Sequence, residues 1–329
     1  MTTNLLTGKV VLITGGTGSF GQAFTRIALQ HNPRTIRLLS RGEFLQSEME
    51  RDFNCPSLRF LLGDVRDVRR LRRAFEGVEI VIHAAALKQV PALEYNPMEA
   101  VQTNVMGSLN VIDAAIDAGV DRVLAISSDK ACYPVNLYGA TKLTMEKLFI
   151  QANSYSGAKG PKFSIVRYGN VVGSRGSVIP LLLSQREKGT VTVTNKTMTR
   201  FWITLEQGIN FSLSCLEQMK GGEVFIPKLP SITIMDLVEV VAPTAKIDFI
   251  GVRPGEKIHE TLMAQEESSH CHEFEKHFVV TPLHPFWTEV EFKGGRVPPM
   301  DFSYTSENNG WKLRGEEIGK LLRGAGIEF

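Results

Sequence analysis

The sequence has few cysteines, no clear excess of either charge and no long apolar run. Its four cysteines (Cys55, Cys132, Cys215 and Cys271) form no CxxC pair, so their spacing predicts neither a disulfide framework nor a zinc site. We therefore expect reduced thiols and no bound metal.

Charge and hydropathy exclude two further classes of protein. The 37 basic and 35 acidic residues give a net charge of +2, without the basic excess typical of nucleic-acid-binding proteins. No apolar run approaches the ~20 residues that a membrane-spanning helix needs, and the first residues do not resemble a secretory signal. We expect a cytoplasmic protein with neither a nucleic-acid nor a membrane partner.

The first half of the chain alternates strand-like and helix-like segments. Apolar runs predict strands at 9–14, 35–39, 58–62, 79–82, 122–126 and 163–167, and helical periodicity predicts helices at 19–30, 43–53, 67–75, 97–118 and 138–154. This alternation predicts an α/β fold with a Rossmann-type, doubly wound parallel sheet. We assign the cofactor-binding Rossmann domain to 1–170. Residues 171–329 are expected to form mainly a smaller substrate-binding lobe, with some elements returning to the sheet.

A glycine-rich loop follows the first predicted strand. Glycines stand at positions 15, 18 and 21, and a helix is predicted to begin there. Glycines permit a tight turn and the close approach of a diphosphate, which the helix N-terminus then stabilises. Strand, loop and helix together predict a dinucleotide site formed by Gly15, Thr17, Gly18, Ser19, Phe20 and Gly21.

The ends of the next strands indicate which dinucleotide binds. The second strand ends in Ser40-Arg41 and lacks the acidic residue typical of NAD sites. Because a guanidinium suits a 2′-phosphate, we predict a preference for NADP. Further cofactor contacts are expected at the ends of the third strand (Asp64 and Val65) and of the fourth (Ala84 and Ala85). His83 is expected to be structural rather than catalytic.

Tyr138 and Lys142 stand four residues apart in a predicted helix, so they share one face. A nearby ammonium favours the tyrosinate, which makes the phenol a candidate base. With the glycine loop, this pair resembles the extended short-chain dehydrogenase/reductase family. The resemblance implies that Ser128 supplies the catalytic hydroxyl and that Lys142 also holds the cofactor.

The pair Asp129-Lys130 narrows the resemblance to one branch. Together with the runs at 136–142, 167–177, 198–202 and 253–257, it resembles the 5-inverting UDP-N-acetylglucosamine 4,6-dehydratases that open pseudaminic acid biosynthesis. That branch usually has threonine at 128, alanine-asparagine at 132–133 and lysine at 45, whereas this chain has Ser128, Cys132-Tyr133 and Leu45.

The resemblance implies a reaction and its residues. Tyr138 would deprotonate the 4-hydroxyl, Lys130 would remove the proton of carbon 5, and Asp129 would protonate the departing 6-hydroxyl. Lys130 must be neutral to act as a base, and the sequence does not show which of its neighbours dominates. The resemblance also implies NADP contacts at Lys88, Val171 and Val172, and a homo-oligomer, often a hexamer. The implied substrate contacts are Lys88, Asn170, Val178, Thr194, Arg200, Arg253 and Glu256.

Two other functions remain open. A UDP-sugar epimerase on the same scaffold would not require Lys130, and would form no 6-deoxy-4-keto sugar. A non-catalytic NADP-binding sensor would bind the cofactor without turnover, although the presence of Ser128, Tyr138 and Lys142 argues against it.

Overall fold

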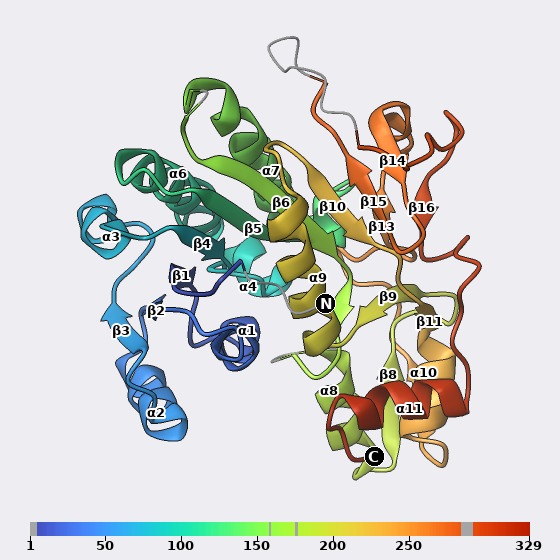
Figure 1. Cartoon of the computed structure of the whole chain (residues 1–329). Helices are drawn as coiled ribbons and strands as arrows, with labels where there is room; N and C mark the ends of the chain where they lie inside the picture. Colours follow the sequence, from blue (N-terminus) through green and yellow to red (C-terminus); the bar gives the residue numbers. More distant parts are fainter. Residues whose placement is uncertain (1–4, 158, 175–176, 284–291) are drawn as a thin grey trace.

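A nine-stranded sheet forms the centre of the protein. The computed structural model describes residues 5–157, 159–174, 177–283 and 292–329 (Figure 1). The strand order is β14-β15-β10-β6-β5-β4-β1-β2-β3. From β3 to β10 all neighbours pair in parallel, and β15 and β14 join antiparallel. The bounds are β1 (Val10–Thr14), β2 (Thr35–Ser40), β3 (Leu58–Leu62), β4 (Ile80–His83), β5 (Arg122–Ser128), β6 (Lys162–Tyr168), β10 (Val224–Pro227), β14 (Cys271–Glu273) and β15 (His277–Val280).

Helices cover both faces of this sheet. In Figure 1, α6 and α7 lie along one face and α1 and α9 along the other; α3 packs on α6, and α1 packs on α9. The strand order 3-2-1-4-5-6 is that of Rossmann folds, which confirms the predicted fold class. The bounds are α1 (Ser19–Leu29), α2 (Glu43–Phe53), α3 (Val68–Phe75), α6 (Gly107–Asp117), α7 (Leu137–Tyr155) and α9 (Leu205–Gln218).

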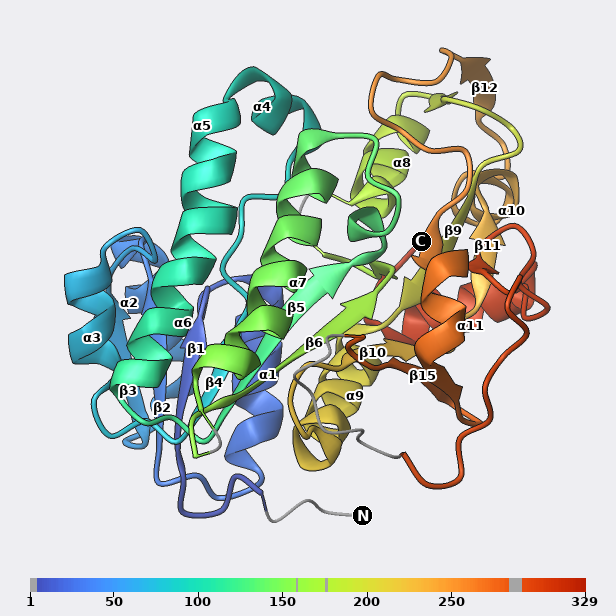
Figure 2. The ribbon, with the colours of Figure 1, turned by 90° about the horizontal axis from the view of Figure 1, so that it is seen from above.

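A second, smaller hydrophobic core lies beside the sheet. It includes the buried residues Trp202, Leu237, Ile318 and Leu322, and Figure 2 shows its helices on the side away from α2 and α3. Its elements are β7 (Asn170–Val171), α8 (Val178–Arg186), β8 (Thr190–Val193), β9 (Thr199–Ile203), β11 (Ser231–Thr233), α10 (Ile234–Val241), β12 (Lys246–Phe249) and α11 (Glu316–Gly324). The division of the chain at residue 170 stays a prediction, since β10, β14 and β15 of the main sheet come from the second half.

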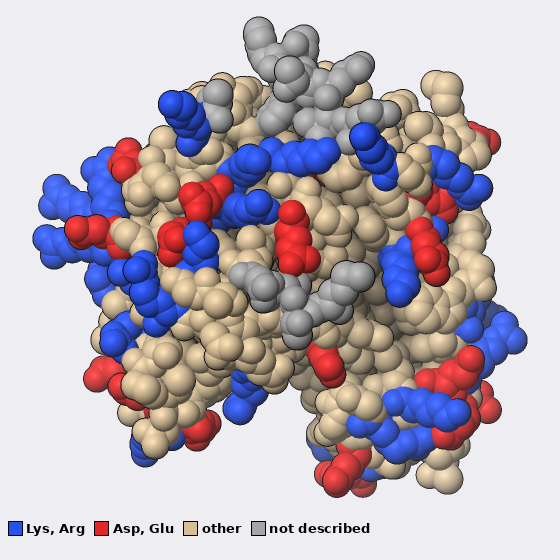
Figure 3. Space-filling view, viewed as in Figure 1, with Lys and Arg blue, Asp and Glu red and all other residues tan. Residues whose placement is uncertain are grey.

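The surface shows the same two parts. In Figure 3 a notch separates the part built on α1 and α2 from the part built on α8 and α11. Lys and Arg side chains gather over α3, at the left edge of that view. Among the residues that the structure describes, no helix is long and apolar enough to cross a membrane.

The helix predicted over 97–118 is present, with a π-helical turn inside it. After the short helix α4 (Val90–Tyr95), the elements α5 (Pro97–Ala100), η1 (Val101–Met106) and α6 follow one another without a break. Asn104, within the π turn, is buried. Its side-chain oxygen accepts a hydrogen bond from the backbone N–H of Leu87, and its Nδ2 donates to the Leu87 carbonyl and to Thr141 Oγ1. Asn104 thereby fastens the segment after β4 to α7.

The last elements connect the outer strands to the carboxyl end of β5. A short 3-10 turn, η2 (Asp129–Ala131), follows β5 and contacts β13 (Thr261–Met263). β13 pairs with β16 (Tyr304–Thr305), and η3 (Gln265–His270) follows β13. β13 therefore lies against the residues that follow β5.

Candidate active site

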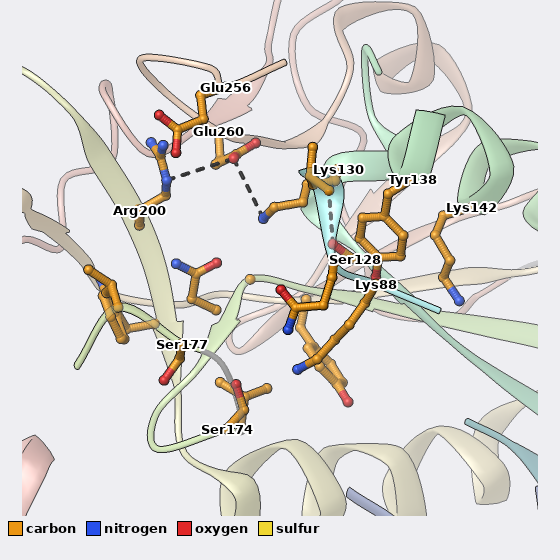
Figure 4. A pocket seen from close by; sticks show the side chains of 18 of the residues that line it. Lys88, Ser128, Lys130, Tyr138, Lys142, Ser174, Ser177, Arg200, Glu256 and Glu260 are labelled. Carbon is orange, nitrogen blue, oxygen red and sulfur yellow. Dashed lines mark hydrogen bonds and ion pairs between the residues drawn. The ribbon is translucent and has the colours of Figure 1, made fainter. Parts of the chain in front are cut away.

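A cavity of about 620 Å³ lies between the carboxyl ends of the main strands and the second core. This central cavity is lined by the glycine loop, the segments after β4 and β5, α7, and Trp202 and Leu237 of the second core. Its size and its place at the strand ends are typical of small-molecule sites in doubly wound folds. Figure 4 shows Tyr138, Lys130, Arg200 and Glu260 around it.

The glycine loop fits a diphosphate. Gly15 has a φ of 73°, and a Cβ there would lie 2.9 Å from the backbone N of Ala85, so a side chain is excluded. The N-cap of α1 is Gly18, which offers no side-chain hydrogen bond to the first turn. The N–H groups of that turn are therefore left for an anion.

The predicted residues of the loop divide between the cavity wall and its support. Thr17 is buried and its carbonyl accepts a hydrogen bond from Gln22. A Cβ on Gly21 would lie 2.5 Å from the carbonyl oxygen of Gly16. The residues that line the cavity are Gly15, Gly18, Ser19, Phe20 and Gly21.

Of the cofactor residues predicted at the ends of β2, β3 and β4, Ala84 lines the central cavity and the others lie beyond its lining. Arg41 is half exposed, with its Nη1 3.8 Å from Asp64 Oδ2, and Ser40 Oγ accepts a hydrogen bond from Gln46. Burial would raise the pKa of Asp64, but hydrogen bonds and the charge of Arg66 lower it below its usual value. Asp64 is thus already held by Arg66, which leaves Arg41 only loosely paired. Val65 is buried, Ala84 lines the cavity, and the backbone N of Ala85 contacts Thr14 Oγ1.

The tyrosine and lysine of α7 both face the catalytic end of β5. Burial raises the pKa of Tyr138, while the charge of Lys130 and a hydrogen bond with Ser128 oppose that rise. Lys142 Nζ donates to the Ile126 carbonyl at 2.6 Å, and burial lowers its pKa to about 8. The charge of Lys130 thus favours the tyrosinate, and the same role for Lys142 stays a prediction.

Asp129 and Lys130 form an ion pair beside Tyr138. Lys130 Nζ donates to Asp129 Oδ1 at 3.0 Å, and Asp129 is fully buried, with no hydrogen bond to its Oδ2 among the described residues. Ser128 Oγ accepts from the backbone N–H of Lys130 and donates to Asp129 Oδ1. The Ser128 hydroxyl therefore fixes the turn that presents both charges.

The charge balance on Lys130, which the sequence left open, favours the ammonium. Burial would lower its pKa, but Asp129 and Glu260 raise it well above its ordinary value, and Arg200 opposes them only in part. Two carboxylates at 3.0 and 3.6 Å outweigh the desolvation. The two carboxylates therefore favour the ammonium form of Lys130.

The predicted substrate residues surround the opposite wall. Arg200 donates to the carbonyls of Thr199, Ile258 and Lys257, so most of its donors are already used. Lys88 lines the cavity without a hydrogen bond or ion pair to any described residue, and burial and the charge of Lys130 lower its pKa. Val172 is buried behind the wall. The other predicted residues on the wall are Asn170, Val171, Val178, Thr194, Arg253 and Glu256.

Two residues of the site were missed by sequence reasoning. Glu260 is 3% exposed and lies near three cations, yet only its place three residues after the 253–257 run hinted at it. Asn104 is fixed by contacts that its sequence neighbours do not reveal.

His83, expected to be structural, is buried between Thr14 and Ser108, and burial lowers its pKa to about 3. Among the described residues no group of three or more metal-binding side chains occurs.

Similarity to known proteins agrees with this geometry. A family model described as a polysaccharide biosynthesis protein matches residues 11–282. A Campylobacter jejuni protein named UDP-N-acetylglucosamine 4,6-dehydratase (inverting) is 48% identical, over 92% of this chain and 93% of its own length. A Rickettsia conorii protein named UDP-glucose 4-epimerase is 38% identical, over 95% of each chain.

The solved structure of Pen from Bacillus thuringiensis is 39% identical, with a TM-score of 0.90, over 97% of this chain and 98% of that one. Family model, relatives and fold agree over most of the length of the chain. The chain therefore belongs to the polysaccharide biosynthesis protein family, within the extended short-chain dehydrogenases/reductases that its motifs predicted.

Proposed function

We propose that this protein is an NADP-dependent hydro-lyase, a UDP-N-acetylglucosamine 4,6-dehydratase that inverts carbon 5. Its product would be UDP-2-acetamido-2,6-dideoxy-β-L-arabino-hex-4-ulose, the first intermediate of pseudaminic acid synthesis for surface or flagellin glycans. One observation carries the proposal: Lys130 lines the cavity beside Tyr138 and the dinucleotide loop, and it is joined at 3.0 Å to the buried Asp129.

The cofactor half of the cavity fits a nicotinamide dinucleotide. The glycine loop leaves no room for side chains at Gly15, and the uncapped first turn of α1 offers N–H groups to a diphosphate. Arg41 would bind the 2′-phosphate that distinguishes NADP from NAD. When bound, the nicotinamide would take a hydride from carbon 4 of the sugar and return it to carbon 6.

The side chains supply the proton transfers. Tyr138 removes the proton of the 4-hydroxyl, helped by the Lys130 charge, which favours its anion. The 4-ketone makes the hydrogen on carbon 5 acidic. Lys130 then removes that hydrogen as a proton, and Asp129 protonates the 6-hydroxyl, which leaves as water.

The ion pair carries the one proton that this elimination needs. In the resting pair Lys130 is an ammonium and Asp129 a carboxylate; passing one proton across 3.0 Å makes a neutral amine and a carboxylic acid. The amine gains the proton of carbon 5 and the acid loses its proton to the hydroxyl. The resting pair is then restored. As hydride returns to carbon 6, a proton from solvent would reach carbon 5 from the opposite face, and Tyr138 would release the proton of the 4-hydroxyl to solvent, so that the protons balance.

The nucleotide would be held by the opposite wall. Arg253 lines the cavity, and its side chain has no ion pair among the described residues, so we assign it the diphosphate in preference to Arg200, whose donors face carbonyls. Asn170, Thr194, Val178 and Glu256 would complete the substrate wall. Lys88 would reach both cofactor and sugar.

An epimerase is the second candidate, because a relative named UDP-glucose 4-epimerase matches 95% of the chain. A 4-epimerase needs no acid and base at carbons 6 and 5. The buried Asp129 and its partner Lys130 would then have no role, which is why we favour the dehydratase.

The test is incubation with UDP-N-acetylglucosamine in heavy water, followed by proton NMR. We expect a 6-deoxy-4-keto sugar with deuterium at carbon 5 and inverted configuration. A 4-epimer would favour the second candidate, and retained configuration would remove the inverting assignment. Lys130→Ala should abolish dehydration, whereas Lys320→Ala, on the exposed face of α11, should not.

The homo-oligomer, a hexamer by family analogy, and the cytoplasmic location stay predictions. Sedimentation velocity of the purified protein tests the first, and fractionation of cells tests the second.

A further inference from the structure

Glu260 is a buried carboxylate in the wall of the central cavity. It is 3% exposed and directly precedes β13, which packs against the turn that contains Asp129 and Lys130. Its backbone N–H donates to Ser306 Oγ, and its carbonyl accepts from the N–H of Ser306. Two bonds to one residue fix its backbone, so its carboxylate occupies a defined place.

Three cations from three segments face this carboxylate. Its Oε1 lies 3.6 Å from Lys130 Nζ and 3.8 Å from Arg200 Nε, and its Oε2 lies 3.5 Å from Lys257 Nζ. Lys257 Nζ also donates to the Cys132 carbonyl at 2.6 Å, which ties it to the turn after β5. Figure 4 shows Glu260 linked to both Arg200 and Lys130.

The predicted reaction uses only one carboxylate of this cluster. Asp129 is the acid and Lys130 the base, so Glu260 is a second anion with no step of its own. Its Oε2 has no hydrogen bond among the described residues. Burying a carboxylate with an oxygen that accepts no hydrogen bond costs folding free energy, unless nearby charges stabilise it. This cost suggests that the position of Glu260 against Lys130 serves the function of the site.

We propose that Glu260 is a positioning residue for the proton transfer at carbon 5: it holds the Lys130 ammonium at the cavity and keeps the proton on the Asp129–Lys130 pair up to high pH. The inference rests on the proposed function, because it concerns the base of that reaction.

The charge of Glu260 matters because the number of protons held by Asp129 and Lys130 together decides whether elimination can occur. Elimination requires one proton shared by Asp129 and Lys130; when the pair loses it at high pH, no acid remains for the 6-hydroxyl. Asp129 and Glu260 favour the protonated lysine, and Arg200 disfavours it. The charge of Lys130 also acts on the pKa of Lys88 and on the pKa of Tyr138, lowering both. These two side chains therefore face the same ammonium. An opposite charge at this range shifts a pKa by about 1–3 units.

The test is Glu260→Gln, which keeps the shape of the side chain and removes its charge. In protein labelled with ¹³Cε-lysine, with Lys130→Arg to assign the resonance, we expect the Lys130 titration midpoint to fall by about 1–3 pH units. The high-pH limit of dehydration should fall with it, while KM for the UDP-sugar changes less than kcat. Glu260→Asp, which retains the charge, should restore most of the high-pH activity.

Glu307→Gln is the matched control, because Glu307 is an exposed carboxylate that pairs with His259 outside the cavity; it should shift neither curve. The proposal is overturned if Glu260→Gln leaves the Lys130 titration in place, or if it lowers activity equally at every pH. Wild-type protein that forms no dehydrated sugar would refute the proposed function, whereas the lysine titration would still decide whether Glu260 sets the charge of Lys130.

Discussion

Replacing Arg167 with methionine should reduce the free energy of unfolding by about 3–5 kcal/mol at neutral pH. Arg167 lies in β6 with a side chain that is 2% exposed. Its guanidinium donates to both oxygens of Glu146, to both oxygens of Glu267 and to the Leu262 carbonyl. Methionine fills much of the same volume but leaves two carboxylates without their cation.

The magnitude follows from the burial of those two carboxylates. The Glu146 side chain is 1% exposed and retains only the Ser127 hydroxyl as a donor, whereas Glu267 is 19% exposed and can be partly hydrated. Most of the loss should therefore come from Glu146. Adding Glu146→Gln to the Arg167→Met variant should recover part of it, because the buried charge is then gone.

Equilibrium urea unfolding at a fixed protein concentration measures this loss. The control is Arg296→Met, because the Arg296 side chain is 79% exposed and its ion pair with Glu273 is on the surface; that change should cost less than about 1 kcal/mol. If Arg167→Met cost no more than the control, the buried network would not hold the segment after β13 to the sheet.

The pH dependence of the loss has a definite sign. Burial would raise the pKa of Glu267, but the charge and hydrogen bonds of Arg167 lower it below the ordinary value. The stability that the pairing supplies is thus complete above the unfolded pKa of about 4.3 and is lost as pH falls through the lower folded pKa. The difference between wild type and Arg167→Met should shrink in that acidic range.

Three further predictions concern the cofactor and the base. Arg41→Glu should weaken NADP binding at least tenfold with little effect on NAD binding, measured by fluorescence titration; equal losses would contradict the assignment of the 2′-phosphate. Tyr138→Phe should lower the rate of sugar oxidation at least a hundredfold while the Kd for NADP changes little, because only the acidic hydroxyl is lost; a rate near that of wild type would exclude Tyr138 as the base. The pKa of Lys142 is lowered to about 8, so its ammonium is lost as pH rises through 8 and the Kd for NADP should rise between pH 7 and pH 9; a flat Kd profile would argue that Lys142 does not contact the cofactor.

Much of the fold was predictable because its signals are local. The predicted strands at 35–39, 58–62 and 122–126 lie within β2, β3 and β5, since β-branched and apolar runs between turns are typical of buried parallel strands. The long helix predicted at 97–118 is present as α5, η1 and α6, but the π turn within it was not predicted. The bonds that Asn104 makes from this turn go to Leu87 and Thr141, which are distant in sequence.

The site shows the same contrast between features with a local sequence signal and features that depend on contacts between distant segments. Motif spacing located the glycine loop, Tyr138 and the Asp129–Lys130 pair. In the structure the loop, Tyr138 and Lys130 line one cavity, and Asp129 is buried beside Lys130. The sequence could not show whether the neighbours of Lys130 raise or lower its pKa, since one of its two carboxylate neighbours, Glu260, is 130 positions away in the chain. Electrostatic balance depends on distance in space, which spacing along the chain does not report.

The π-helical turn at Val101–Met106 makes the site sensitive to chain length as well as to residue type. A π turn contains more residues than an α turn. Deleting one residue from this turn would let α5 and α6 continue as one regular helix with little relative rotation, because the π turn absorbs the extra residue. The wide turn that places Asn104 against Leu87 and Thr141 would be lost, and with it the link between the segment that ends in Lys88 and the helix of Tyr138. In this region a single-residue deletion that leaves every catalytic side chain in the sequence should therefore disturb the site more than most substitutions of exposed residues in the same helix.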